Sequence, residues 1–199
     1  MEKYDLAIGL NLILIILEII ALIQCWNALG CIDFRYYTID SNIFVLISAI
    51  LYLITRKNVP KAVQLAKYSS ALSVLITFLV VVFVLYPMYD FNFQFLFLAG
   101  PNLLMHVVCP LMTFISFVFF EENDLENSFK NNLRSLYFTL VYAIILISLN
   151  ILKIVVGPYP FLKVYEQPVH MSILWICVIL LGAFLLSRLM MGLRKLGSI

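Results

Sequence analysis

The chain consists of long apolar segments separated by short polar breaks, and this pattern restricts it to one kind of fold. The six segments cover approximately residues 5–27, 37–56, 66–87, 101–120, 132–153 and 169–191. Each has the roughly 20 residues that an α-helix needs to cross about 30 Å of hydrocarbon. Hydrophobic residues make up 64% of the chain, more than a soluble domain of this size can bury. The sequence therefore predicts an all-α, polytopic membrane protein with six transmembrane helices in a single domain, residues 1–199.

The basic residues orient the predicted spans. With six spans, both termini and the 57–65 and 121–131 loops share one side, which carries ten of the thirteen Lys and Arg residues. These ten are Lys3, Arg56, Lys57, Lys61, Lys67, Lys130, Arg134, Arg188, Arg194 and Lys195. By the positive-inside rule, both termini are predicted to be cytoplasmic in a protein of the cell membrane. The acidic run on the same side is expected to be a solvated loop; it comprises Glu121, Glu122, Asp124 and Glu126.

Composition also argues against several functions. The net charge of +2 is too small to indicate nucleic-acid binding. The four cysteines form no CxxC pair, which argues against a zinc ribbon or a thioredoxin-type site. No cofactor or metal is implied, and membrane lipids are the expected partners.

The segment from Asn102 to Pro110 places a histidine and a proline inside a predicted span. Pro110 has no N–H, so the helix is expected to bend and to leave the carbonyl of His106, four residues back, without its partner. In hydrocarbon, a carbonyl in that state and an imidazole are tolerated only where protein or water satisfies them. The segment therefore predicts a buried polar pocket.

Two polar stripes run inward from the outer surface at helical spacing. One consists of Thr38, Ser41, Asn42, Val45, Ser48, Ala49 and Tyr52, and the other of Asn102, His106, Cys109, Thr113 and Ser116. Thr38 and His106 differ in depth by about 6 Å at 1.5 Å per residue, so their side chains can meet in the outer half of the bundle. Two structural alternatives stay open: Thr38 as a helix N-cap, and His106 as a core histidine hydrogen-bonded to a neighbour.

Other ionisable groups are candidates on weaker grounds. Glu18 falls near the middle of the first span, where it is either functional or a protonated acid bonded to a neighbouring helix. His170 opens the last segment, four residues after Glu166. With His106, and with Glu166 or Asp40, it offers donors for a divalent metal, although a solvated, interfacial His170 is favoured.

Three motifs in this order resemble a known family. The first is Phe34-Arg35-Tyr36-Tyr37-Thr38-Ile39-Asp40-Ser41-Asn42, which has the form F-x-[YF]-x-T-x-x-S-N. The second is Met105-His106, followed closely by Pro110, and the third is Tyr159-Pro160-Phe161-Leu162. The combination resembles the androgen-induced/FAR-17a-like family of multi-pass membrane threonine hydrolases and their small bacterial relatives.

The resemblance implies an activity and two catalytic residues. Characterised members of that family cleave fatty-acid esters of hydroxy fatty acids, with a threonine nucleophile and a histidine base. The matching positions here are Thr38 and His106. From the chemistry of such a pair, we expect Asn42 or Ser41 to donate to the oxyanion and Glu18 or Asn102 to orient the histidine.

The leading expectation is thus a hydrolase of lipid esters with its site in the outer half of the bilayer. One alternative is a small transporter or scaffold membrane protein without catalysis. Another is a metal-dependent lipid hydrolase that uses His106 and His170. A polar lining continuous to the cytoplasmic side would favour transport, whereas a cavity closed below Glu18 would favour the enzyme.

Overall fold

The computed structural model describes residues 3–196, with side chains through Arg194, and every regular element in that range is helical. Lys195, one of the predicted cytoplasmic basic residues, lies outside the described side chains. The α-helices are α1 (Lys3–Leu29), α2 (Tyr37–Thr55), α3 (Lys61–Val80), α4 (Tyr86–Met88), α5 (Cys109–Ile115), α6 (Phe129–Ser135), α7 (Tyr137–Ile151) and α8 (Val169–Leu196). The π-helical turns are η1 (Val81–Leu85), η2 (Gln94–Leu98), η3 (Leu104–Val108) and η4 (Ser116–Phe120), and η5 (Pro160–Leu162) is a 3₁₀ turn.

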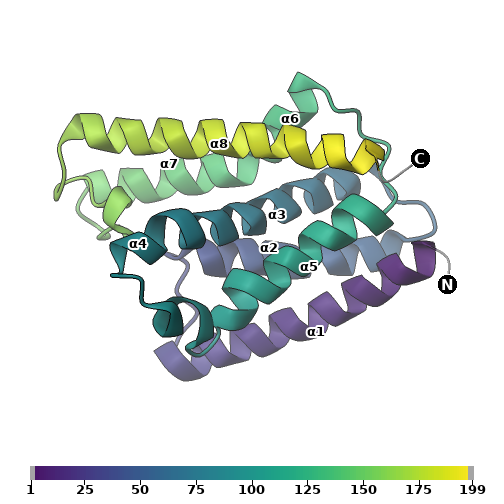
Figure 1. Cartoon of the computed structure of the whole chain (residues 1–199), viewed down its shortest axis with the longest axis horizontal. Coiled ribbons are helices and arrows are strands. Elements are labelled where there is room, and N and C mark those ends of the chain that lie inside the picture. Colours follow the sequence, from purple (N-terminus) through teal and green to yellow (C-terminus); the bar gives the residue numbers. More distant parts are fainter. Residues whose placement is uncertain (1–2, 197–199) are drawn as a thin grey trace.

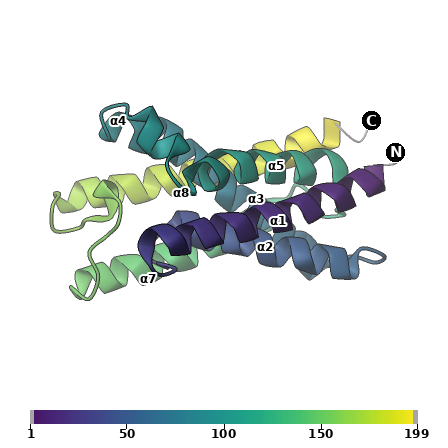
Figure 2. The ribbon, with the colours of Figure 1, turned by 90° about the horizontal axis from the view of Figure 1, so that it is seen from below.

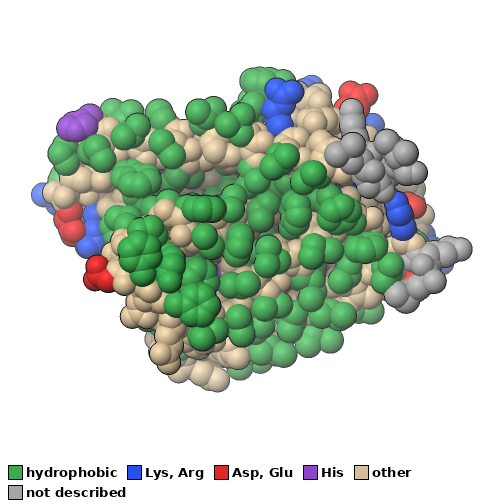
Figure 3. Space-filling view, in the orientation of Figure 1, with side chains coloured by type: hydrophobic (Ala, Val, Ile, Leu, Met, Phe, Trp, Pro, Cys, Tyr) green, Lys and Arg blue, Asp and Glu red, His purple; other side chains and the backbone are tan. Residues whose placement is uncertain are grey.

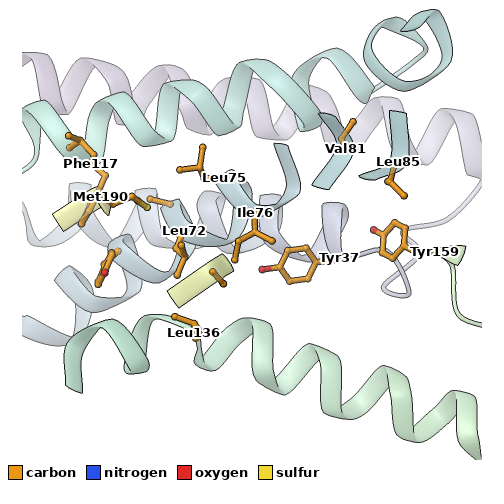
Figure 4. Packing of buried hydrophobic residues seen from close by; sticks show 14 of the residues in the cluster. Tyr37, Leu72, Leu75, Ile76, Val81, Leu85, Phe117, Leu136, Tyr159 and Met190 are labelled. Carbon is orange, nitrogen blue, oxygen red and sulfur yellow. The ribbon is translucent and has the colours of Figure 1, made fainter. Parts of the chain in front are cut away.

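The helices lie side by side in one bundle around α3 (Figure 1). Helix α3 packs against α2, α5, α6, α7 and α8. Its residues Leu72, Leu75 and Ile76 lie in the main hydrophobic core, which is drawn in Figure 4. The turned view shows the start of α1 and the end of α8 at the same end of the bundle (Figure 2). We call this end the inner end and the opposite end the outer end.

Fewer helices are long enough to cross a membrane than the sequence predicts. Within residues 3–196, four helices meet the length and hydropathy that a span requires: Lys3–Leu29, Tyr37–Thr55, Lys61–Met88 and Val169–Arg194. The pair α6 and α7, bent by 45°, makes a fifth if it is one span. The expected 101–120 segment supplies the shorter apolar helix Leu104–Phe120, and the chain turns ahead of it at Gly100, whose φ is +53°.

The surface is compatible with a surrounding membrane. Hydrophobic side chains cover the middle of the face in Figure 3, and charged side chains gather at its two ends. Large apolar residues on different helices are strongly exposed, including Ile16, Ile54, Ile144 and Leu181. Lipid tails can cover such side chains, whereas water would leave an apolar surface of this extent unstable.

A buried ion pair joins the helices toward the inner end. Lys67 Nζ lies 3.1 Å from Glu121 Oε1, and both side chains are at most 2% exposed. Asn11 on α1 donates to Glu121 over 2.9 Å and accepts from Lys67 over 2.8 Å. The prediction that the acidic run is solvated is therefore wrong for Glu121, because a buried lysine and a buried amide hold its carboxylate. The side chains of Glu122, Asp124 and Glu126 are exposed, as predicted.

Candidate active site

The two predicted polar stripes meet at Thr38 and His106. Helix α2 begins at Tyr37 and its cap residue is Tyr36, so Thr38 lies inside the first turn and is not the N-cap. The Thr38 hydroxyl is therefore available to other groups, and its Oγ1 lies 3.5 Å from His106 Nε2. The hydroxyl of the candidate nucleophile and an imidazole nitrogen are thus within hydrogen-bond distance.

A backbone carbonyl sets the tautomer of His106. Nδ1 lies 2.6 Å from the carbonyl oxygen of Leu96 in η2. A carbonyl only accepts, so Nδ1 carries the proton of the neutral ring and Nε2 keeps its lone pair. Nε2 faces Thr38 and accepts from its hydroxyl. This is the arrangement in which an imidazole acts as a base toward a hydroxyl.

The break at Pro110 is a π turn, which changes the predicted bonding by one residue. The Cys109 N–H donates to Leu104 O, five residues back, so in this register Pro110 faces the carbonyl of Met105. Asn42 Nδ2 donates to Met105 O over 3.2 Å. The carbonyl that receives a side-chain donor is therefore that of Met105 and not that of His106, as the sequence predicts for a regular α-helix.

The two expected oxyanion donors hold the backbone that bears Thr38. Asn42 Nδ2 donates to Thr38 O over 2.7 Å, and Ser41 Oγ donates to the same oxygen over 3.1 Å. Ser41 also bonds to Thr77 on α3 over 3.0 Å. These contacts fix the first turn of α2 in place, and they use the donors that were expected to face a substrate.

Tyr159 is a site residue to which sequence reasoning gave no role. Its hydroxyl oxygen accepts from the Thr38 N–H over 3.4 Å, so its own O–H can donate to a neighbouring group. Burial raises the pKa of Tyr159 to about 12, and the hydroxyl therefore keeps its proton at neutral pH. The Tyr159-Pro160-Phe161-Leu162 motif was the available sequence signal.

The loop that bears Tyr159 is closely packed. The Tyr159 ring stacks on Phe161 with centroids 5.4 Å apart, and Phe161 lies 5.6 Å from Trp175 of α8. Gly157 approaches the backbone of Leu162 so closely that a Cβ at position 157 would lie 2.6 Å from Leu162 O. Glycine at 157 is thus a requirement of the conformation that presents Tyr159.

The expected orienting residues lie elsewhere. Glu18 is fully buried beside the thiol of Cys109, on the face that α1 turns toward α5. Asn102 Nδ2 donates to Phe95 O over 2.7 Å, next to the carbonyl that holds His106. Asn102 therefore supports η2, and the direct orienting contact comes from Leu96.

Two cavities meet at Thr38. The outer cavity has a volume of about 380 Å³ and is lined by His106, Asn102 and residues of the outer loops. The apolar chamber, of about 70 Å³, lies among α2, α3, α7 and α8. Thr38, Tyr159 and Leu85 line both.

The outer cavity does not continue to the inner end through the part of the chain that the structure describes. Its lining extends to Cys25 and Met105 and does not include Glu18. The cavity at the inner end, lined by Lys3 and Arg194 among others, shares no lining residue with it. Within the described residues, the outer cavity and the cavity at the inner end are thus separate.

The metal hypothesis has no donor set in residues 3–194. No group of three His, Cys, Asp or Glu side chains in that range is arranged to hold a metal ion. His170 is exposed, and Glu166 forms an ion pair with Lys163 over 2.9 Å. His106 already uses Nδ1 on Leu96 and Nε2 on Thr38.

No family model matches the chain, and comparisons with curated proteins and with solved structures gave no match. The function is therefore argued from the geometry of this site.

Replacing Gly157 by Ala is expected to lower stability by about 1–3 kcal/mol, because the added methyl group overlaps the Leu162 backbone. Thermal unfolding of the purified protein in detergent measures the effect. Gly182→Ala is the matched control, since a Cβ there meets nothing within 4 Å. Equal unfolding temperatures for Gly157→Ala and wild type would contradict the packing described for this loop.

Proposed function

We propose that the chain is an integral membrane hydrolase of lipid esters, similar to the androgen-induced/FAR-17a-like threonine hydrolases. The observation that supports it most directly is the 3.5 Å contact between Thr38 Oγ1 and the unprotonated Nε2 of His106. In this proposal Thr38 is the nucleophile and His106 is the general base, and the substrate is an ester lipid of the membrane.

The proposal includes six spans with both termini cytoplasmic and the site in the outer half of the bilayer. The sixth span is the shorter helix Leu104–Phe120, which lies within the bundle against α1 and α3. Two observations support this orientation. The start of α1 and the end of α8 lie at the same end of the bundle, and most basic residues of the sequence belong to that side.

The first half of the reaction forms an acyl-threonine. Thr38 Oγ1 attacks the ester carbonyl carbon while its proton moves to His106 Nε2, and the carbonyl electron pair moves onto oxygen. When the carbonyl re-forms, the bond to the alcohol oxygen breaks. That oxygen takes the proton from Nε2 and leaves as the free alcohol.

The second half releases the acid. A water molecule in the outer cavity gives its proton to Nε2 and attacks the acyl carbon. The bond to Thr38 Oγ1 then breaks, and Oγ1 takes the proton back from Nε2. The product is a carboxylic acid, and the Thr38 hydroxyl and the neutral His106 ring are regenerated. The two half-reactions together consume one water molecule and balance.

Tyr159 supplies the donor to the oxyanion in this proposal. Its hydroxyl lies beside the backbone of the nucleophile and keeps its proton because its pKa is about 12. A fixed O–H in an apolar site stabilises a negative oxygen more strongly than water does. Asn42 and Ser41, in contrast, have their donors on the carbonyl of Thr38.

The direct test is hydrolysis of fluorogenic esters by the detergent-purified protein. Thr38→Ala and His106→Ala are each expected to lower kcat by about 10²-fold or more, and Thr38→Ser is expected to keep measurable activity. Thr55→Ala, whose hydroxyl bonds only to the backbone of its own helix, is the matched control. Unchanged hydrolysis by Thr38→Ala would contradict the proposal, and a wild type inactive on all esters would favour a transporter or scaffold.

Replacing Tyr159 by Phe is expected to lower kcat by about 10²-fold with little change in KM, because the lost hydroxyl acts mainly on the transition state. The wild-type rate should show no loss from Tyr159 ionisation as the pH rises to about 11, since its pKa is about 12. Tyr165→Phe, in the same loop but bonded to Ile151 O, is the control. Equal kcat values for Tyr159→Phe and Tyr165→Phe would exclude the oxyanion role.

A further inference from the structure

The apolar chamber is walled by four helices and by the loop that bears Tyr159. Its apolar lining includes Ile76, Val80, Leu85, Ala143, Phe161 and Ile179. Figure 4 shows Val81, Leu85, Tyr37 and Tyr159 at the same end of the core. The chamber extends along α3 and η1 from Ile76 to Leu85, a rise of about 13 Å at roughly 1.5 Å per residue.

The hydroxyl groups on the chamber wall bond to the protein itself. Tyr37 and Thr139 share a hydrogen bond of 2.7 Å. Thr77 bonds to Ser41 over 3.0 Å, and Tyr142 donates to the Arg35 carbonyl over 2.7 Å. Since their polar atoms are satisfied within the wall, these residues present mainly hydrocarbon to the interior. A polar ligand would find few groups there to replace its bonds to water.

The chamber and the outer cavity meet at the reacting hydroxyl. Thr38 and Tyr159 line both, whereas His106 and Asn102 line only the outer cavity. An ester whose carbonyl lies at Thr38 therefore faces the apolar chamber on one side and the polar groups of the outer cavity on the other. Because the proton acceptor faces the outer cavity, the leaving alcohol and the incoming water belong on that side.

We infer that the apolar chamber binds the acyl chain of the ester, and that Ala143 limits the length of chain it accepts. This inference rests on the proposed function and specifies where the acyl part of the substrate binds. The walls of the chamber are almost entirely hydrocarbon and begin at the reacting hydroxyl, so a hydrocarbon chain is the occupant that suits them. Ala143 is the smallest side chain among the lining residues, and enlarging it on α7 reduces the space without removing a polar contact.

Photolabelling by a fatty acid with a terminal diazirine tests this without requiring hydrolysis. Peptide mass spectrometry of the detergent-purified protein is expected to find adducts on chamber residues such as Ile76, Val80 and Ile179, and excess unlabelled fatty acid should compete them away. Ala143→Phe should lower the chamber adducts at least tenfold, and the smaller Ala143→Val should lower them less. Ala28→Phe, which fills the outer cavity, is the control and should keep them.

A second readout is the hydrolysis of p-nitrophenyl esters of graded acyl length. Ala143→Leu is expected to shift the preferred chain to shorter esters, and Ala28→Leu is expected to leave the preference unchanged. Competed chamber adducts without hydrolysis by the wild type would support the acyl site and contradict the proposed function. The acyl site alone would be overturned if hydrolysis depends on Thr38 but the adducts lie only outside the chamber. The same conclusion would follow if Ala143→Leu keeps the chain-length preference of the wild type.

Discussion

The hydrogen bond from His106 Nδ1 to the Leu96 carbonyl, at 2.6 Å, is the contact on which the chemistry of the site depends. It decides which ring nitrogen is basic and turns that nitrogen toward Thr38. The carbonyl is itself held in place, since Asn102 donates to the adjacent Phe95 O and Phe97 packs on Tyr86 with centroids 5.5 Å apart. The short helix η2, which lies between the third and fourth apolar segments of the sequence, thereby supports the base.

The cost of polar groups in an apolar bundle explains how the remaining stripe residues are used. The π turn before Pro110 leaves a carbonyl that needs a donor, and Asn42 provides it while also holding Thr38 O. Toward the inner end, Lys67 and Glu121 neutralise each other and join α3 to the end of η4. The buried polar groups toward the inner end thus serve structural contacts, and the groups suited to chemistry lie toward the outer end.

Periodicity alone placed Thr38 and His106 on facing stripes at compatible depths, and their contact confirms that prediction. Asn11, Glu18 and Cys25, spaced seven residues apart, are all buried on α1. Periodicity did not locate the Leu96 carbonyl, because a backbone acceptor leaves no pattern in side-chain identity. The solvated position predicted for Glu121 was wrong, because its burial depends on tertiary packing against Lys67. Of the six predicted spans, four are matched by full-length helices among the described residues, and the bent pair α6 and α7 makes a fifth if it is one span.

The central claim is that His106 activates the hydroxyl of Thr38, and an alkyl fluorophosphonate tests it most directly. The activated oxygen attacks phosphorus and displaces fluoride, leaving a stable adduct whose position peptide mass spectrometry identifies. We predict one adduct on Thr38 in the wild type, none at that position in His106→Ala, and no labelling of Thr38→Ala, with all three proteins unfolding at similar temperatures. Equal labelling of Thr38→Ala, or a wild type that stays unlabelled, would contradict it.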